Sequence, residues 1–224
     1  TSNGTYKAGD EINLTVNFSE AVTLSSGGSM TVTLETGSTD RTVSIASISN
    51  AASATGSYTV QDDDESSDLN VKSITVSGTL SDNSGQIMED YSIASNLSSS
   101  SAIVVDGVAP TVASVKSTST NTTYGTGASI NITVNFSEAV SLSSGGSMTL
   151  TLETGSTNED GTVSITSISS ASSASGTYTV RDGDASVDLS VNSIALSSGA
   201  SLSDAAGNAM SDFSVPADSN LSDF

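Results

Sequence analysis

The sequence predicts an all-β protein made of two consecutive β-sandwiches, and three observations lead to this prediction. Hydrophobic side chains alternate with Ser, Thr and Asn in short runs, as between Ile12 and Phe18 and between Met30 and Leu34. Alternation with a period of two is typical of strands that bury one face. Helical spacing is not sustained anywhere, and the second half of the chain repeats the first. The 224 residues are enough for two domains of ordinary size.

The internal repeat covers almost the whole chain. The segment YKAGDEINLTVNFSEAVTLSSGGSMTVTLE, which begins at Tyr6, matches YGTGASINITVNFSEAVSLSSGGSMTLTLE, which begins at Tyr124. Further along, SYTVQDDDESSDLNVKSI from Ser57 matches TYTVRDGDASVDLSVNSI from Thr177, and LSDNSGQIMEDYS matches LSDAAGNAMSDFS. A period near 120 residues is far longer than a solenoid unit. The sequence therefore predicts a duplicated domain.

The boundary between the copies is expected at the segment DGVAP, residues 106–110, where Gly loosens the backbone and Pro stiffens it. This gives immunoglobulin-like repeats at 1–105 and 106–224. Copy 1 has no counterpart of Thr111–Val115 and copy 2 has none of Ala102–Val105. We therefore expect repeat 1 to lack its first strand and repeat 2 its last. These ends favour a piece of a longer array, and the alternative is a subunit that borrows an edge strand from its neighbour.

Each copy is expected to contain about seven strands. Six are placed in copy 2, at 111–117, 129–136, 147–153, 162–168, 176–181 and 189–196, and copy 1 supplies the seventh at 102–106. Seven alternating strands in a unit of about 110 residues indicate a Greek-key immunoglobulin-like β-sandwich. The large side chains of Tyr58, Tyr178, Phe18 and Phe136 are expected to pack in the two cores.

Composition excludes several classes of function. The chain has 25 acidic and 5 basic residues, a net charge of -20, so nucleic acid is not an expected partner. It has no Cys and no His, which removes disulfides, thiol and imidazole catalysis and almost every zinc or haem site. No apolar run is long enough to span a bilayer, so direct membrane insertion is not expected. A glycosidase-type carboxylate pair remains, but nine aromatic residues are too few for cores and sugar platforms, so we expect no enzyme.

Several motifs together resemble a known family. Copy 1 contains the run YKAGDEI, the boundary contains IVVDGVAPTV, and copy 2 contains LTLETG, YTVRDGDASVDL and LSDAAGNAMSDF, while NFSEAV occurs in both copies. They resemble the tandem immunoglobulin-like repeats of very large bacterial surface proteins, which include calcium-dependent, ice-binding and biofilm adhesins. The resemblance implies a spacer or adhesive repeat outside the cell, often stiffened by Ca²⁺, with no catalytic activity.

The positions of the carboxylates lead independently to Ca²⁺. In a seven-strand sandwich, Glu138 at the end of the second strand, and Asp204 and Asn208 in the last loop, belong to one pole. Asp106 of the linker arrives at this pole, and copy 1 directs its acidic loop 62–68 toward the same junction. Crowded carboxylates repel one another, and Ca²⁺ relieves this by taking six to eight oxygen ligands. We therefore expect Ca²⁺ to rigidify the junction between the domains.

The candidate metal ligands are acidic or amide residues, and most of them recur in both copies. The spacing D-x-D-x₃-D occurs twice, and its alternative interpretation is a solvated turn that keeps a β-protein soluble. The candidates are Glu20, Asp62, Asp64, Asp68, Asp82, Asp106, Glu138, Asp182, Asp184, Asp188, Asp204 and Asn208.

These observations predict a structural or extender repeat of an extracellular microbial surface adhesin, rigidified by calcium. Its expected partners are adjacent repeats or copies of itself. One alternative is a self-assembling surface-layer or filament subunit joined by strand exchange. A second is a calcium-assisted carbohydrate-binding module, which the shortage of aromatic residues disfavours.

Overall fold

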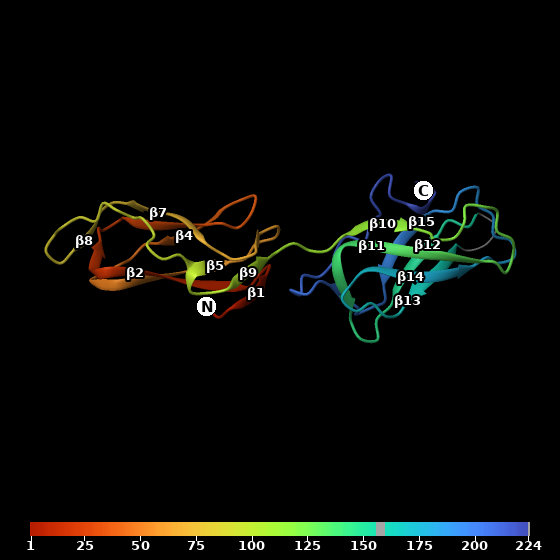
Figure 1. The fold of residues 1–224 in the computed structure, drawn as a ribbon, viewed down its shortest axis with the longest axis horizontal. Coiled ribbons are helices and arrows are strands. Elements are labelled where there is room, and N and C mark those ends of the chain that lie inside the picture. Colours follow the sequence, from red (N-terminus) through yellow and green to blue (C-terminus); the bar gives the residue numbers. More distant parts are fainter. Residues whose placement is uncertain (156–159, 224) are drawn as a thin grey trace. The chain divides into compact units, whose positions relative to one another are not determined.

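The computed structural model describes residues 1–155 and 160–223, and the chain divides into two compact units after Val108. The division lies three residues beyond the predicted boundary. Strands and two single-turn 3₁₀ helices make up the regular structure of the described residues (Figure 1). The predicted all-β class is therefore confirmed. In the described part of the chain, no helix has the length and apolar character needed to cross a membrane.

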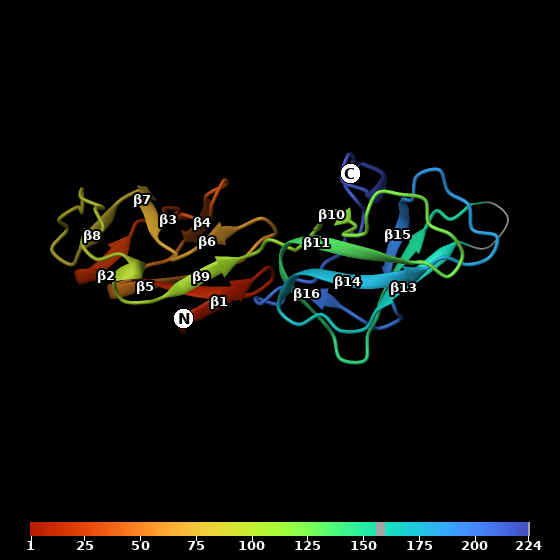
Figure 2. The same ribbon diagram turned by 45° about the vertical axis from the view of Figure 1, so that its right-hand side comes forward.

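Unit 1, residues 1–108, is a sandwich of two three-stranded sheets with a third small sheet at one edge. Its elements are β1 (Gly4–Lys7), β2 (Glu11–Leu24), β3 (Ser29–Leu34), β4 (Arg41–Ile45), β5 (Ala51–Thr59), β6 (Glu65–Ser66), β7 (Val71–Ser77), β8 (Leu80–Asp82), η1 (Leu97–Ser99) and β9 (Ile103–Asp106). The sandwich sheets have the orders β5-β2-β8 and β4-β3-β7. In the third sheet β9 lies between β1, its parallel neighbour, and β6, its antiparallel neighbour (Figure 2).

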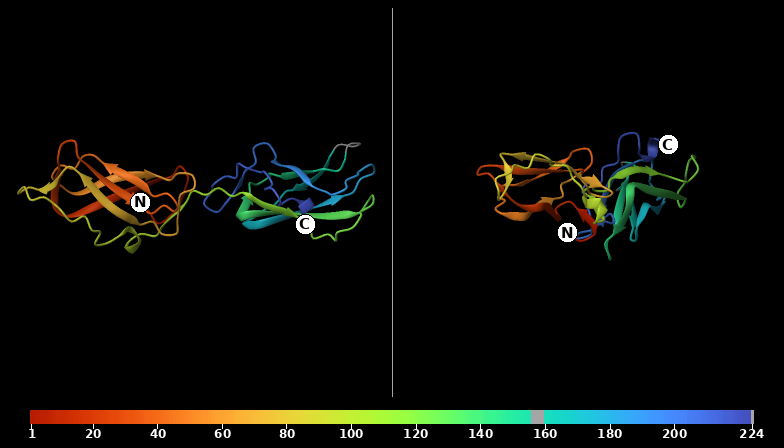
Figure 3. Two further views of the ribbon diagram at one scale, coloured as in Figure 1. Left: turned by 90° about the horizontal axis from the view of Figure 1, so that it is seen from above. Right: turned by 60° about the vertical axis from the view of Figure 1, so that its left-hand side comes forward.

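Unit 2, from Ala109 onward, repeats the two sandwich sheets. Its elements are β10 (Val112–Lys116), β11 (Ser129–Leu142), β12 (Met148–Leu152), β13 (Gly161–Ile165), β14 (Ala171–Thr179), β15 (Val191–Leu196), β16 (Leu202–Ser203) and η2 (Leu221–Asp223). The sheet orders are β10-β11-β14, with β16 also paired to β11, and β13-β12-β15. The C-terminal segment lies beside β10 (Figure 3), where the N–H of Val115 donates to the carbonyl of Ser219 at 2.9 Å.

Alternation in the sequence explains the cores. Along β3 every second residue is buried, and the same holds for β12 and β13. Each unit encloses one apolar cluster between its sheets. Tyr58, Tyr178 and Phe136 are buried as predicted. Phe18 is only half-buried, because its equivalent Phe136 is paired with β10 and unit 1 has no strand in that position.

Two paired strands of unit 2 are longer than the sequence predicts, because their pairing continues beyond a register shift. β11 was expected to end at 136 but continues to Leu142 through a register shift between Asn135 and Val140. Beyond the shift, Val140 pairs with Ala171, which starts β14 five residues before the expected position. The stretch ASSASG from Ala171 contains no large side chain, so hydrophobic alternation cannot reveal it as a strand.

Candidate functional site

The last loop of unit 2 is closed by a buried carboxylate. Asp204 is 7% exposed, and one of its oxygens accepts the backbone N–H groups of Gly207 at 2.6 Å and Asn208 at 2.8 Å. The other oxygen accepts the side-chain amide of Asn208 at 2.8 Å. Asp204 and Asn208, both predicted ligands, thus lie together and fix a tight turn after β16. This is the local hydrogen bonding that Asp favours in turns.

Glu138 lies next to this turn. It is in the irregular part of β11, between Asn135 and Val140, rather than at the end of a strand as the sequence suggested. A carboxylate oxygen of Glu138 and one of Asp204 lie within 4.8 Å of each other, and Glu138 is half-buried. The two acids thus form a close pair of carboxylates with oxygen ligands of the type that Ca²⁺ takes.

The chain enters unit 2 directly beside Glu138. The N–H of Ser137 donates to the carbonyl of Thr111 at 2.9 Å, and the N–H of Thr111 donates to the Ser137 hydroxyl oxygen at 3.0 Å. Thr111 is five residues after Asp106. The covalent chain therefore leads from the carboxylate of Asp106 to the neighbour of Glu138 over a short path.

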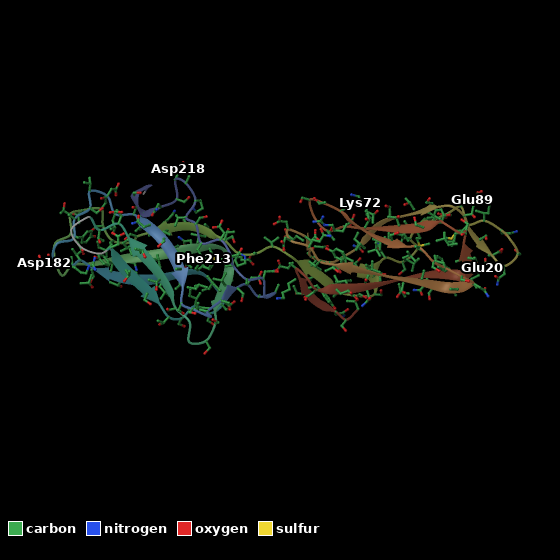
Figure 4. All side chains as sticks on the ribbon, turned by 180° about the vertical axis from the view of Figure 1, so that it is seen from behind. Glu20, Lys72, Glu89, Asp182, Phe213 and Asp218 are labelled. Atoms are coloured by element: carbon green, nitrogen blue, oxygen red, sulfur yellow. The ribbon has the colours of Figure 1, made fainter. Side chains whose placement is uncertain are left out.

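Unit 1 has the equivalent pair of positions, Glu20 and Asp82. Asp82 ends β8 and accepts hydrogen bonds from the backbone of Gln86 at 2.8 Å and from the backbone and hydroxyl of Ser84 at 2.8 Å each. These bonds, led by that from Gln86, hold the pKa of Asp82 below its usual value. Glu20 is exposed at the same end of unit 1 as Glu89 (Figure 4). The unit 1 turn is therefore similar to that of Asp204, with its carboxylate less buried.

Asp106 ends β9, where it is paired in register with Glu65 of β6. Two carboxylates opposite each other on neighbouring strands repel. The next residue, Gly107, exchanges backbone hydrogen bonds with the acidic loop: it donates to Asp64 at 2.7 Å and accepts from Asp63 at 3.1 Å. A Cβ on Gly107 would overlap the carbonyl oxygen of Gln61, so only glycine fits here. Unit 1 thus ends in a tightly held acidic segment.

Asp64, the middle Asp of the first D-x-D-x₃-D motif and a predicted metal ligand, is held by hydrogen bonds within unit 1. Asp64 is 1% exposed, and it accepts hydrogen bonds from the Tyr58 hydroxyl, from the backbone of Gln61 at 2.9 Å and from Arg41 Nε at 2.7 Å. Both carboxylate oxygens are used. Burial, followed by the hydrogen bond to Asp64, raises the pKa of Tyr58 above its usual value. We therefore assign Asp64 to the core of the loop.

Asp184 has the same role in unit 2 with a different arginine. It accepts hydrogen bonds from the Tyr178 hydroxyl, from the backbone of Arg181 at 2.7 Å and from the Arg181 guanidinium at 3.1 Å. Burial alone would raise the pKa of Asp184, but the bonds from Tyr178 and Arg181 outweigh it and hold the pKa below its usual value. The arginine equivalent to Arg41 is replaced by Gly161, whose missing side chain leaves room for the Tyr178 ring.

The remaining candidates in these motifs are exposed. Asp62 and Asp68 in unit 1 and Asp182 and Asp188 in unit 2 lie on the loops around the two Asp–Tyr pairs. Asp182 is visible at one end of unit 2 in Figure 4. Figure 2 shows the β14–β15 loop at the opposite end of unit 2 from β16, so Asp182 and Asp188 do not join the Glu138–Asp204 pair.

The pairing of Tyr58 with Asp64, and of Tyr178 with Asp184, was not predicted from the sequence. The signal was present, because a Tyr precedes an Asp by six residues in both copies. Two asparagines that bind a strand edge with both amide atoms were not predicted either. Asn96 bonds Val71 and Asn220 bonds Val191, at 2.8 and 2.9 Å respectively. Their recurrence in the repeated SNLS was the available signal.

Comparisons with known proteins give no family. No protein-family model matches the chain, and no curated protein matches it. Among solved structures it is similar to a DUF4785 family protein from Legionella pneumophila, with 13% identity, a TM-score of 0.30 and 87% of this chain covered. It is also similar to the FN1–FN3 domains of chicken CNTN1, with 11% identity, a TM-score of 0.23 and 96% covered. The chain spans 50% of the first structure and 64% of the second.

Proposed function

We propose that the chain is a structural extender repeat of an extracellular microbial surface adhesin, with Ca²⁺ bound where one repeat joins the next. The duplicated sandwich supports a repeat function, because two copies of one domain follow each other in a single chain. The order of the motifs supports the adhesin class. Adjacent repeats are the partners that this function requires.

The observation that carries the calcium proposal is the close pair Glu138–Asp204 at the start of unit 2. Two carboxylates this close repel each other, and a cation bound between them relieves the repulsion. The chain has only five basic residues. Three of them form ion pairs with other carboxylates: Arg41 with Asp64, Lys72 with Asp40 and Arg181 with Asp184. A divalent cation is therefore well suited to this pair.

Asp106 is the third ligand in this proposal. Residue 111 is fixed next to Ser137, and five residues of extended chain reach at most about 17 Å. The linker can thus fold Asp106 back to the pair. Ca²⁺ accepts irregular sets of carboxylate, amide and backbone oxygens, whereas Mg²⁺ demands octahedral geometry. An ion held by Asp106, Glu138 and Asp204 would restrict the linker and stiffen the array.

Calorimetry tests the calcium proposal. A ligand that binds only the folded state raises the melting temperature, so the wild-type protein in EDTA should melt at lower temperature than in millimolar Ca²⁺. Glu138→Gln removes one ligand without breaking the Asp204 turn, and should lose most of the calcium shift. Glu89→Gln, an exposed carboxylate outside the predicted set, is the matched control and should keep it.

The stiffening itself is measured by small-angle X-ray scattering. Calcium should narrow the distribution of the maximum dimension of the wild-type chain, and Glu138→Gln should abolish this narrowing. The absence of any melting shift with Ca²⁺ would overturn the calcium part of the proposal. A melting shift with Ca²⁺ but no narrowing of the distribution of the maximum dimension would support calcium binding and overturn its role in stiffening the chain.

A further inference from the structure

Unit 2 contains an open groove of about 490 Å³, with polar walls and aliphatic residues at its floor. One wall is the segment 117–124, which precedes β11, and the other is the loop segment 184–189. The floor contains Ile130, Val180 and Leu189, which are only partly buried, and Leu221 also lines the groove. Val187, fully exposed, lies on the rim. A groove with an aliphatic floor between two chain segments that are not paired in any sheet offers a place for an added strand.

Unit 1 shows what fills this position. The residues equivalent to the floor are Ile12, Val60 and Leu69, which are 0%, 2% and 0% exposed. They belong to one cluster with Ile103 and Val105 of β9, which are themselves buried. The N–H of Leu69 donates to the carbonyl of Ile103 at 2.7 Å. In the described part of unit 2 no strand takes the place of β9, and the floor residues are accordingly only partly buried.

Each wall of the groove shares one hydrogen bond with its equivalent in unit 1, although β1 and β6 have no counterpart among the strands of unit 2. The Tyr124 hydroxyl donates to the carbonyl of Thr120 at 2.6 Å, as Tyr6 donates to Ser2 at 2.7 Å, so the tyrosine of the wall equivalent to β1 is held in the same way. On the other wall, the N–H of Ala185 donates to the carbonyl of Thr154 at 2.8 Å. The equivalent Glu65 of β6 donates to Thr36 at 3.0 Å.

We propose that this groove of unit 2 binds an extended peptide strand with the side-chain pattern of β9, supplied from outside the 224 residues. The pattern is an aliphatic residue, any residue, a second aliphatic residue, then Asp-Gly. By analogy with β9, the strand runs parallel to 122–125 and antiparallel to 185–186. Its two aliphatic side chains cover Ile130, Val180 and Leu189.

The glycine of the pattern gives specificity. In unit 1 a Cβ at Gly107 would overlap the carbonyl oxygen of Gln61, and Gly107 bonds the backbone of Asp64 at 2.7 Å. The equivalent loop of unit 2 is held in the same way, because Tyr178 and Asp184 pair as Tyr58 and Asp64 do. An occupant with a side chain at this position should therefore be rejected. The ligand is a strand of defined sequence, and the proposal does not depend on Ca²⁺.

The test is a titration of the full 224-residue protein, in EDTA, with a fluorescent peptide of sequence SAIVVDGVAP, residues 101–110. Fluorescence anisotropy should show saturable binding. In the same protein, NMR methyl signals of Ile130, Val180 and Leu189 should shift. A peptide with Ile103→Asp, and a second with Gly107→Val, should bind at least tenfold more weakly.

Protein variants give an independent control. Leu189→Ser should weaken binding of the peptide at least tenfold, whereas Ile87→Ser, an exposed aliphatic residue of unit 1, should not change it. No binding at millimolar peptide, equal affinity for the Ile103→Asp peptide, or shifts confined to Val60 and Leu69 would each overturn the proposal. A chain that dimerises without peptide, and becomes monomeric with Leu189→Ser, would show that the occupant is a second copy and that the proposed partner is wrong.

Discussion

Replacing Asp64 by Asn should destabilise unit 1 far more than the small change in side-chain shape suggests. Asn has nearly the same shape, so no cavity forms, but the charge is lost and an amide nitrogen replaces one oxygen. That nitrogen cannot accept a hydrogen bond, although Tyr58, Gln61 and Arg41 all donate to this carboxylate. At least one buried donor then loses its acceptor.

The size of the effect follows from burial. Removing one partner of a buried ion pair costs about 3–5 kcal/mol. The Asp64 side chain is 1% exposed, but that of Arg41 is 25% exposed, and water reaching the guanidinium reduces the loss. We therefore expect a loss near the lower limit, about 3 kcal/mol. For a domain of about 100 residues this corresponds to a fall in melting temperature of about 12 °C, at about 4 °C per kcal/mol.

Asp184→Asn in unit 2 is the matched comparison. The same three kinds of donor face Asp184, but the side chain of Arg181 is 44% exposed. Its charge stays well solvated when the partner is lost, so the melting temperature should fall by less. Differential scanning calorimetry of the wild type and the two variants measures both losses, and each variant shifts the transition of its own unit.

Two results would refute this reasoning. A fall of less than about 1 kcal/mol in the free energy of unfolding for Asp64→Asn would show that the buried carboxylate is not needed as an anion. A larger fall for Asp184→Asn than for Asp64→Asn would show that exposure of the arginine does not control the size of the loss.

Two further predictions concern unit 2. Because the folded pKa of Asp184 is below the unfolded value of 3.8, its contribution to stability is complete above that pH and is lost as pH falls through the folded pKa. Below pH 4 the melting temperature should therefore fall less steeply with pH for Asp184→Asn than for the wild type. Parallel curves of melting temperature against pH would contradict this. Gly176→Ala would overlap a methyl group of Val163 and should cost about 1–3 kcal/mol in urea unfolding, whereas Gly125→Ala, with no atom within 4 Å, should be close to neutral.

Much of the fold could be predicted from the sequence, because alternation reports which strand face is buried. β3 and β12 were located this way, and the internal repeat gave the two units. The start of β14 could not be located, since ASSASG pairs through its backbone and its side chains are too small to show which face is buried. The pairing of β16 with β11 was also missed, because it involves only two residues on each strand and is too short to show alternation.

The candidate site was predicted in part. Loop topology correctly brought Glu138, Asp204 and Asn208 to one end of unit 2, because strand direction decides which loops share an end. The exposed or buried position of a single Asp could not be inferred from spacing. Asp62 and Asp64 are two residues apart, yet only Asp64 lies where a buried Tyr hydroxyl and an Arg can reach it.

The two arginines also restrict genetic exchange between the repeats. A crossover in the corresponding region would join the first half of unit 2, which carries Gly161, to the second half of unit 1, which carries Gln61. The product would bury Asp64 with Tyr58 but with neither arginine. The reciprocal product would place two guanidinium groups at one carboxylate. Recombination between these similar repeats is therefore penalised wherever it separates position 41 from position 61, which favours exchange of the two repeats as whole units.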